Sequence, residues 1–361
     1  MPWSKVEFFP GGDAYYDSLV AAIAGARRSV LIEKYIFRFD RTGHAVLRAL
    51  SEARARGVRV LLRVDGVGTR DEVPALADYC ASHGIEFEVF HPLPFARILR
   101  RRGLVRLDSF LARWRALNRR SHRKLVLVDD ETGFSGGRNV DDVESERRAG
   151  NHAWHDLSIR VEGSAMKRLV RAFWLWPFRK QPSRDFLLNY NWRLKRSRNT
   201  WFHRRIHEAR RRLWIVTPYF APTPAMLFQI RHAARLGADV RLVLPEKNDV
   251  ALSQFAARAL YWQILGWGVR VFEYQPKILH RKLWVIDELC VVGSGNLNHR
   301  SFMHDLEIDV ILHQPAHVQL GAELFLDDQV RSREILRDDL ARLPLVRRVL
   351  YWLASWLVYW L

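Results

Sequence analysis

The stretch of sequence that decides the fold is His122-Arg123-Lys124-Leu125-Val126-Leu127-Val128-Asp129, continued by Gly136-Gly137-Arg138-Asn139. The same pattern returns later in the chain as His280-Arg281-Lys282-Leu283-Trp284-Val285-Ile286-Asp287, continued by Gly293-Ser294-Gly295-Asn296. Residues two apart on a β-strand point to the same face, so the His and the Lys of each copy share a face. The apolar run after each Lys predicts a buried strand that turns at the Asp. Two full copies at matching positions are hard to explain by packing alone.

The segments that precede the two motifs are repeated as well. Each copy reads as strand, helix, strand, helix and strand. The matching segments are 27–36, 45–56, 58–64 and 84–90 in the first copy and 211–220, 224–236, 240–244 and 268–272 in the second. Gly57 and Gly237 end the two amphipathic helices, as expected of C-cap glycines. Strands that alternate with helices predict an α/β fold, and 361 residues suffice for two domains.

The predicted architecture is therefore two fused halves, each a mixed, largely parallel β-sheet flanked by helices. We place the first half at residues 1–163, with a basic insert at 92–121, and the second half at residues 201–335. Residues 164–200 are interpreted as a Trp-rich linker between the halves. Residues 336–361 are interpreted as a separate C-terminal tail.

The composition indicates an anionic partner. The formal net charge is +19, which suits nucleic acid and acidic lipid headgroups equally well. The 14 Trp residues favour lipid, because Trp prefers the membrane–water interface, although any single Trp is more often part of a core. The Arg-rich insert fits an anionic surface and a solvated helix about equally, and both interpretations stay open.

The repeated residue types suit chemistry at a phosphodiester. Two Lys ammonium groups and the amides of Asn139 and Asn296 match the phosphoryl oxygens in number and charge. Ser294 and Gly137 stand beside these amides, where the backbone can approach a ligand closely. One imidazole can attack phosphorus while the other protonates the leaving oxygen. This chemistry calls for no metal and no cofactor.

Each imidazole also needs a carboxylate that holds its reactive tautomer. Asp156 precedes an alternating strand downstream of the first motif, and Glu307 lies in a similar strand downstream of the second. We expect each acid to orient the imidazole of its own copy. Asp305 is an alternative to Glu307. Any of these orienting acids could instead be a surface residue at a strand edge.

The duplicated motif, His-x-Lys-x4-Asp continued by Gly-x-x-Asn, resembles that of the phospholipase D superfamily. The resemblance covers the chain from about Val6 to Leu326. The sequence that flanks the motifs is most similar to that of short bacterial cardiolipin synthases without transmembrane helices at the N-terminus. The segments that carry this closer similarity are Tyr35-Ile36-Phe37, Val64-Asp65-Gly66-Val67-Gly68, Tyr219-Phe220-Ala221-Pro222 and Val271-Phe272-Glu273-Tyr274.

The resemblance implies a phosphohistidine intermediate and an active site at the pseudo-twofold interface between the halves. It assigns catalytic roles to His122, Lys124, Asp129, His280, Lys282 and Asp287. The second copy departs from the pattern, since five residues rather than six separate its Asp from the following Gly. We expect this tighter hairpin to shift Ser294 and Asn296 slightly.

The implied activity is transfer of a phosphatidyl group from one phosphatidylglycerol to another, giving cardiolipin and glycerol. A phospholipase D hydrolase, a nuclease of the same superfamily and a non-enzymatic binder of anionic membranes or nucleic acid remain alternatives. The expected partners are an anionic phospholipid substrate and a membrane surface. Nucleic acid is disfavoured, and the sequence does not indicate an oligomeric state.

The C-terminal run at residues 349–361 is uncharged and rich in Trp and Tyr. As a helix it would reach about 20 Å, short of the roughly 30 Å hydrocarbon core of a bilayer. It therefore predicts a peripheral or monotopic anchor to the bacterial cell membrane, with the catalytic halves on the cytoplasmic side. Docking of this helix on the protein's own core and a protein–protein contact are the alternatives.

Overall fold

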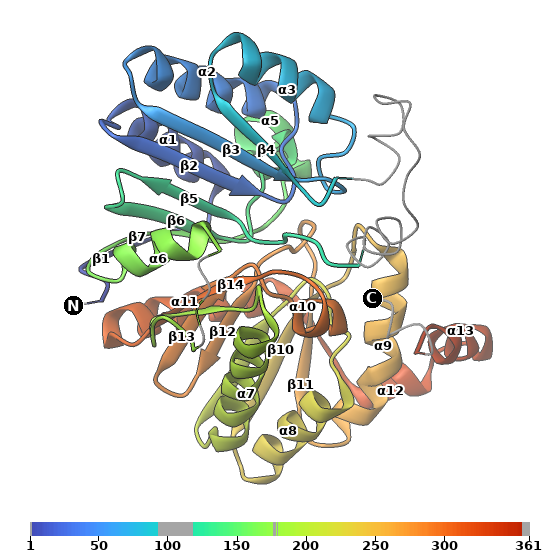
Figure 1. Cartoon of the computed structure of the whole chain (residues 1–361). Coiled ribbons are helices and arrows are strands. Elements are labelled where there is room, and N and C mark those ends of the chain that lie inside the picture. The colour runs from blue at the N-terminus through green and yellow to red at the C-terminus, as the bar shows by residue number, and fades with distance from the viewer. Residues whose placement is uncertain (1, 93–117, 176–177, 179, 356–361) are drawn as a thin grey trace, which may run out of the picture. The chain divides into compact units, whose positions relative to one another are not determined.

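The computed structural model describes residues 2–92, 118–175, 178 and 180–355 (Figure 1). The chain divides into two compact units. The first unit comprises Met1–Ala153, Ser158–Pro177 and His304–Ile308, and the second comprises Trp154–Leu157, Phe178–Met303 and Asp309–Leu361. Most of the insert predicted at 92–121 lies outside the described residues.

The first unit contains a seven-stranded mixed sheet in the order β1-β7-β6-β5-β2-β3-β4. Its strands are β1 (Lys5–Phe9), β2 (Ser29–Lys34), β3 (Arg59–Asp65), β4 (Glu86–Phe90), β5 (Leu125–Val128), β6 (Thr132–Gly136) and β7 (Ser158–Glu162). The pairs β2–β3 and β3–β4 are parallel, and the other pairs among these strands are antiparallel. The prediction of a mixed sheet is confirmed. The expectation of largely parallel pairing is wrong, because the motif strand β5 enters the sheet as part of an antiparallel hairpin.

Helices cover both faces of this first sheet. The helices α1 (Gly12–Ala24), α2 (Arg41–Ala55) and α3 (Val73–Ser82) share one core cluster with Phe134 of β6. The neighbouring Gly133 instead meets Met166 and Leu169 of α6 (Met166–Phe173). Because successive residues of a strand face opposite ways, α6 covers the other face.

The second unit contains an eight-stranded sheet in the order β15-β11-β10-β9-β12-β13-β14-β8. Its strands are β8 (Phe186–Leu188), β9 (Arg212–Val216), β10 (Asp239–Pro245), β11 (Arg270–Tyr274), β12 (Leu283–Ile286), β13 (Leu289–Gly293), β14 (Ile308–Leu312) and β15 (Ser332–Ile335). As in the first unit, three neighbouring strands are parallel, here β9, β10 and β11. The motif strand β12 joins them antiparallel, through β9.

The helices of the second unit repeat the arrangement of the first. One face carries α7 (Trp192–Glu208), α8 (Pro224–Arg235) and α9 (Ala251–Leu265), which share a core cluster. The other face carries α11 (Pro315–Val330), whose Phe325 stacks on Trp214 of β9 with ring centroids 5.1 Å apart. The shorter helices are α5 (Glu146–Ala149), α10 (His299–Met303) and α12 (Arg337–Ala341), with 3-10 turns at Asp142–Glu144 and Gly150–His152.

The repeated helix ends are as the sequence predicted. Helices α2 and α8 are followed by Gly57 and Gly237, whose φ angles are +90° and +86°. Only a residue without a Cβ adopts this left-handed conformation without strain, which explains a glycine at both places.

The predicted linker at 164–200 is not a linker. Its first part forms α6 in the first unit, and its later part forms β8 and the start of α7 in the second. Two short segments also belong to a different unit from the one that their position in the sequence suggests. Trp154–Leu157, which follows the first motif, belongs to the second unit, and His304–Ile308, which follows the second motif, belongs to the first.

The two motif hairpins differ only at their turns. In the first unit Val128 pairs with Thr132, leaving three turn residues, whereas in the second Ile286 pairs with Leu289, leaving two. At the other end of each hairpin, the first residue of the motif strand pairs with a residue of the return strand. The next residue along the return strand is Gly136 in the first unit and Gly293 in the second. The missing residue is therefore absorbed by the turn, and the expected shift of the return strand in the second unit does not occur.

The strand register also corrects the alignment of the repeats. Glu33 of β2 lies opposite Leu125, and Val216 of β9 lies opposite Leu283. The equivalent of Glu33 is thus Val216, one residue away from the match between 27–36 and 211–220 that sequence similarity suggests.

The C-terminal tail forms α13 (Leu345–Ser355), and residues 356–361 lie outside the described residues. Tyr351 is buried, with its ring 5.8 Å from Phe255 of α9. Among the side chains of this helix whose burial is described, the exposed apolar ones are Leu345, Val346, Val349, Leu350 and Leu353. Within the described parts of the chain, no helix combines the length and the hydrophobicity needed to cross a bilayer.

Candidate active site

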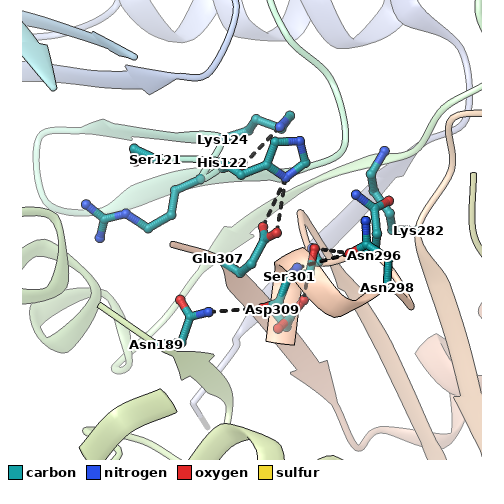
Figure 2. Close-up of polar contacts among 12 residues, drawn as sticks. Ser121, His122, Lys124, Asn189, Lys282, Asn296, Asn298, Ser301, Glu307 and Asp309 are labelled. Carbon is teal, nitrogen blue, oxygen red and sulfur yellow. Dashed lines mark hydrogen bonds and ion pairs between the residues drawn. The ribbon is translucent and has the colours of Figure 1, made fainter. Parts of the chain in front are cut away.

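His122 stands just before β5, with its Nδ1 turned to a carboxylate (Figure 2). Nδ1 lies 3.2 Å from both Oε1 and Oε2 of Glu307, which is fully buried. The strand-like segment that carries Glu307 is held beside the motif, because the N–H of Leu306 donates to the carbonyl of Arg120 at 2.8 Å. The first unit therefore contains a preassembled imidazole–carboxylate pair.

Lys124 lies on the same side of the chain as His122, as the spacing predicted. Its Nζ is buried and donates to the carbonyl of His122 at 3.0 Å. The ring of Tyr35 lies 5.0 Å from the imidazole, and Lys124 Nζ is 5.3 Å from the centre of the same ring. The aromatic face and the peptide oxygen thus hold the ammonium group next to the imidazole.

The second unit builds the same arrangement around His280. Its Nδ1 lies 2.6 Å from Oδ2 of Asp156, which is fully buried. Lys282 Nζ donates to the carbonyl of His280 and lies 4.0 Å from the same carboxylate oxygen. The segment that carries Asp156 is bound on both sides of His155, whose N–H donates to Ile278 and whose carbonyl accepts from the N–H of His280, each at 2.8 Å.

Aromatic rings flank this second imidazole too. The rings of Trp154 and Tyr219 lie 5.0 Å and 6.2 Å from that of His280. The sequence interpretation gave no role to these rings or to Tyr35. The signal for the two Tyr residues was present, since Tyr35 and Tyr219 match in the sequence repeat, although the strand register offsets them by one residue.

The pairing of acids with imidazoles is crossed relative to the sequence-based expectation. Asp156, downstream of the first motif, contacts His280 of the second, and Glu307, downstream of the second motif, contacts His122 of the first. The expectation that each acid serves its own copy is wrong. The physical reason is the exchange of the two short segments between the units.

Asp129 and Asp287 do not lie beside the imidazoles. Each stands at the far end of its motif strand, in the left-handed conformation, with φ of 55° and 47°. The carboxylate of Asp129 accepts the N–H groups of the three residues 27–29, at 2.7 to 2.9 Å. Asp287 accepts those of residues 210–212 in the same way. These acids fix the start of β2 and β9 against the hairpin turn, which is a different task from the catalytic role that the resemblance implied.

The predicted phosphate-binding residues follow the return strands of the two hairpins. Asn139 Oδ1 accepts the N–H of Ile36 at 3.2 Å. Asn296 donates its backbone N–H to Ser301 Oγ at 3.0 Å, and its own Oδ1 is buried and has no hydrogen-bond partner among the described residues. Gly137 and Ser294 are both buried beside these amides. Each Asn follows the return strand of its own hairpin, but the Asn139 side chain accepts a backbone N–H whereas the Asn296 Oδ1 accepts none from the described residues.

Two fully buried arginines stand behind the imidazoles, and the sequence interpretation overlooked what neutralises them. Arg123 Nη2 donates to Glu33 Oε2 at 2.6 Å, within the first unit. Arg281 Nη1 donates to Asp328 Oδ2 at 2.7 Å, within the second. Asp328 also lies 2.6 Å from Nε2 of His155. Nothing local in the sequence marks Asp328, which stands in the last turn of an otherwise ordinary helix.

Each unit thus offers an imidazole with an acid on one nitrogen, an ammonium group and an amide. This set can supply a nucleophile or a general acid together with charge stabilisation for phosphoryl oxygens. Within either unit taken alone, the described residues bring no three metal-ligating side chains together.

Comparisons with known proteins agree with this fold and these motifs. The family model described as "Cardiolipin synthase, PLD-like domain" matches residues 19–152 and 202–328. Cardiolipin synthase A of Pseudomonas putida strain GB-1 is 30% identical over 358 residues, covering 93% of this chain and 71% of that protein. Cardiolipin synthase A of P. putida strain W619 is 31% identical over 361 residues, with the same coverage.

Solved structures show the same architecture at low sequence identity. Phosphatidylserine synthase of Haemophilus influenzae Rd KW20 superimposes with a TM-score of 0.73 at 13% identity, covering 99% of this chain and 95% of that one. Polyphosphate kinase of Porphyromonas gingivalis gives a TM-score of 0.61 at 14% identity, covering 97% of this chain and 55% of that one. At such identities the likeness concerns the fold alone.

The fold of two similar units, each with its own His-x-Lys motif, defines a phospholipase D-type enzyme. Within that class the chain belongs to the family of cardiolipin synthases with phospholipase D-like domains. It is an enzyme of the phosphatidyltransferase type.

Proposed function

We propose that this protein is a cardiolipin synthase that transfers a phosphatidyl group from one phosphatidylglycerol to another. The observation that carries the proposal is the pair of buried carboxylates, Glu307 and Asp156, each on Nδ1 of one motif histidine. The names of the curated relatives support the substrate class, and the +19 net charge suits an anionic lipid.

In the proposed first step, Nε2 of His122 attacks the phosphorus of phosphatidylglycerol. A phosphorus–nitrogen bond forms, the bond to the glycerol oxygen breaks, and His280 gives that oxygen a proton. In the second step His280 takes a proton from a hydroxyl of another phosphatidylglycerol, whose oxygen displaces the phosphatidyl group from His122. The products are cardiolipin and glycerol, and both histidines return to their starting state.

The acids and cations have separate tasks in this scheme. Glu307 and Asp156 hold the tautomer that leaves Nε2 reactive, and they stabilise an imidazolium when one forms. Lys124 and Lys282, with the amides of the two Asn residues, would stabilise negative charge on the phosphoryl oxygens. Lys282 Nζ also lies 4.0 Å from Oδ2 of Asp156. We assign the nucleophile to His122 by family resemblance.

The decisive experiment is product analysis with vesicles of phosphatidylglycerol as the only lipid. Thin-layer chromatography should show cardiolipin, with free glycerol released in equal amount, and little phosphatidic acid. Phosphatidic acid as the main product would make the protein a hydrolase. Cleavage of single-stranded DNA without any lipid product would make it a nuclease.

The proposed chemistry uses imidazoles and requires no metal ion. Turnover should therefore survive incubation with EDTA followed by gel filtration. Strong inhibition that a divalent cation reverses would overturn the metal-free mechanism.

We further propose that α13 and the residues after it attach the enzyme to the cytoplasmic face of the bacterial membrane. The exposed Leu345, Val349 and Leu353 of α13 support a membrane contact, whereas buried Tyr351 attaches the helix to α9. Deletion of residues 349–361 should move the protein toward the soluble fraction of cells. A truncated protein that remains membrane-bound at the original level would show that the tail is not the anchor.

A further inference from the structure

In the second unit, one end of the sheet carries both the motif histidine and several exposed apolar side chains. The parallel strands β9, β10 and β11 have their carboxyl ends on this edge. His280 lies at the same edge, because it precedes β12, which runs antiparallel to β9 with Leu283 opposite Val216. Any helix that follows β9 or β10, or that leads back into β9, therefore begins at this edge.

Two such helices begin with exposed apolar residues. Helix α7 leads into β9, and its first residue, Trp192, is 67% exposed. Helix α9 follows β10, and Val250 and Leu252 at its start are 40% and 38% exposed. Figure 1 shows α7 and α9 as separate helices of this unit.

Two further residues extend this group. Met303, at the end of α10, is exposed and is tied to α7 by Lys195 Nζ, which donates to its carbonyl at 2.5 Å. Val330, the last residue of α11, is 83% exposed. It lies close in sequence to the start of β15, which pairs with the carboxyl end of β11. We call Trp192, Val250, Leu252, Met303 and Val330 the apolar collar.

Cations stand among the collar residues. The guanidinium of Arg193 lies 5.1 Å from the ring centre of Trp192, and Arg196 is exposed one turn further along α7. Lys247 is exposed between β10 and α9. The exposed Asp249 in this stretch accepts a hydrogen bond from the hydroxyl of Tyr219, at 2.8 Å to Oδ2.

Exposed Trp, aliphatic side chains and Arg or Lys together are the composition of a surface that sits at a membrane–water boundary. Exposed aliphatic residues gain nothing from contact with the phosphates or bases of a nucleic acid, whereas lipid acyl chains take them up favourably. The equivalent helices of the first unit, α1, α2 and α3, show no large exposed hydrophobic residue among their described positions, although Val67, between β3 and α3, is 38% exposed.

We propose that the apolar collar inserts into the surface of an anionic lipid bilayer, so that the edge of the second unit bearing His280 faces the membrane. The proposal rests on the proposed function only in that the substrate is a membrane lipid. No collar residue belongs to α13, although α13 packs on α9 at Phe255, one turn after the collar residue Leu252.

The test compares two double variants that introduce the same charge. Trp192→Glu with Leu252→Glu alters the collar, and both sites lie in the first turn of a helix, where an acidic residue is tolerated well. Leu236→Glu with Leu336→Glu is the matched control, because both residues are exposed apolar positions at the opposite end of the same sheet.

Binding is measured by co-sedimentation with vesicles of phosphatidylcholine containing one third phosphatidylglycerol, using the full chain. The collar variant should bind at least about 30-fold more weakly than wild type, since it loses apolar insertion and gains charge repulsion. The control variant should stay within about threefold of wild type. Equal losses in both variants, or no loss in the collar variant, would overturn the proposal.

Turnover separates this inference from the proposed function. The collar variant should lose activity on vesicles and keep it on phosphatidylglycerol dispersed in detergent, where no bilayer has to be entered. Absence of cardiolipin with wild type would sink the proposed function while the binding result still decides the collar. If the collar variant instead abolishes self-association, or binding to a single-stranded oligonucleotide, and keeps vesicle binding, the collar belongs to another partner and the proposal fails.

Discussion

The motif strand has two faces, and the two units resemble each other on one of them but differ on the other. They are alike on the face that carries the imidazole, where His122 and His280 each contact one buried carboxylate. In both units the Lys two residues later donates a hydrogen bond to the carbonyl of that histidine. On the opposite face stand Arg123 and Arg281, both fully buried. Here the units diverge in which element supplies the neutralising acid.

In the first unit the acid is Glu33, which comes from the neighbouring strand β2 and also lies 3.5 Å from Arg63. In the second unit Val216 takes that strand position, and the acid is Asp328 from helix α11. A buried guanidinium must be neutralised, but any element within reach can do it. The proposed chemistry would therefore require the same residues on one face of the strand in both units, whereas the other face requires only an acid within reach of the Arg.

The largest effect should come from the face on which the units agree. His122→Ala and His280→Ala should each lower kcat by about 10⁴-fold or more, since residues that act as one unit are not additive. The double variant should be no worse than either single one. Turnover of radiolabelled phosphatidylglycerol measures this, and a single variant with more than about a tenth of wild-type activity would break the equivalence of the two units.

The crossed acids should follow in size. Asp156→Asn and Glu307→Gln should each lower kcat by about 10² to 10⁴-fold, because an amide no longer fixes the reactive tautomer. We expect the larger loss for Asp156, whose contact of 2.6 Å with its imidazole is shorter than the contacts of 3.2 Å that Glu307 makes with His122.

Asp305→Asn is the matched control for these two variants, since it removes an acid from the same crossing segment as Glu307. It should leave kcat within a few-fold of wild type. If Asp305→Asn were as damaging as Glu307→Gln, the contact between Glu307 and His122 would not be the origin of the effect.

The acids behind the strand should affect folding stability more than chemistry. Glu33→Gln and Asp328→Asn each leave a buried Arg without its ionised partner, at a cost of about 3–5 kcal/mol in the free energy of unfolding. Urea denaturation followed by tryptophan fluorescence measures the loss. If either variant is too unstable to purify, the pair can be removed together.

The paired removal Arg281→Met with Asp328→Leu should be less destabilising than Asp328→Asn alone, because no buried charge is left over. The same logic applies to Arg123→Met with Glu33→Leu. Double variants that are as unstable as the single ones would show that shape rather than charge decides this face.

Much of the fold could be predicted because it depends on local signals. Strand periodicity, the glycines at 57 and 237, and the duplicated motif each act over a few residues. The helix and strand segments therefore lie within a few residues of the expected positions. The amount of parallel pairing and the predicted linker at 164–200 were wrong, since both depend on which strand neighbours which.

The site residues divide in the same way. His122, Lys124 and their counterparts were identifiable from spacing, because a strand places residues two apart on one face. The crossing of Asp156 and Glu307 could not be predicted, because it depends on where a short segment docks after the chain has left its own unit. Asp328 was missed for a similar reason, since its partner Arg281 stands 47 residues away in sequence.

The smallest expected effect concerns the turns, where the hairpins differ in length but the acids make the same contacts. Asp129→Asn and Asp287→Asn should each cost about 0.5–2 kcal/mol at pH 7, as for loss of a helix N-cap, because each acid accepts three backbone N–H groups. Equal costs would show that the shorter turn leaves this anchor intact. A cost for Asp287→Asn below half that for Asp129→Asn would show the opposite.

The pH dependence of the Asp129→Asn cost provides a second check. Burial raises the pKa of Asp129, but the N–H groups of Ser29, Arg27 and Arg28 outweigh it and bring the pKa below its usual value. A carboxyl with a depressed pKa stabilises the fold above its unfolded pKa of about 3.9, and this contribution is lost as the pH falls through the folded value. The difference between wild type and Asp129→Asn in the free energy of unfolding should therefore be constant from pH 7 to about pH 5 and shrink below about pH 4. Urea titrations at pH 7, 5 and 3.5 measure it, and a difference that grows on acidification would mean that the N–H groups do not favour the ionised carboxylate.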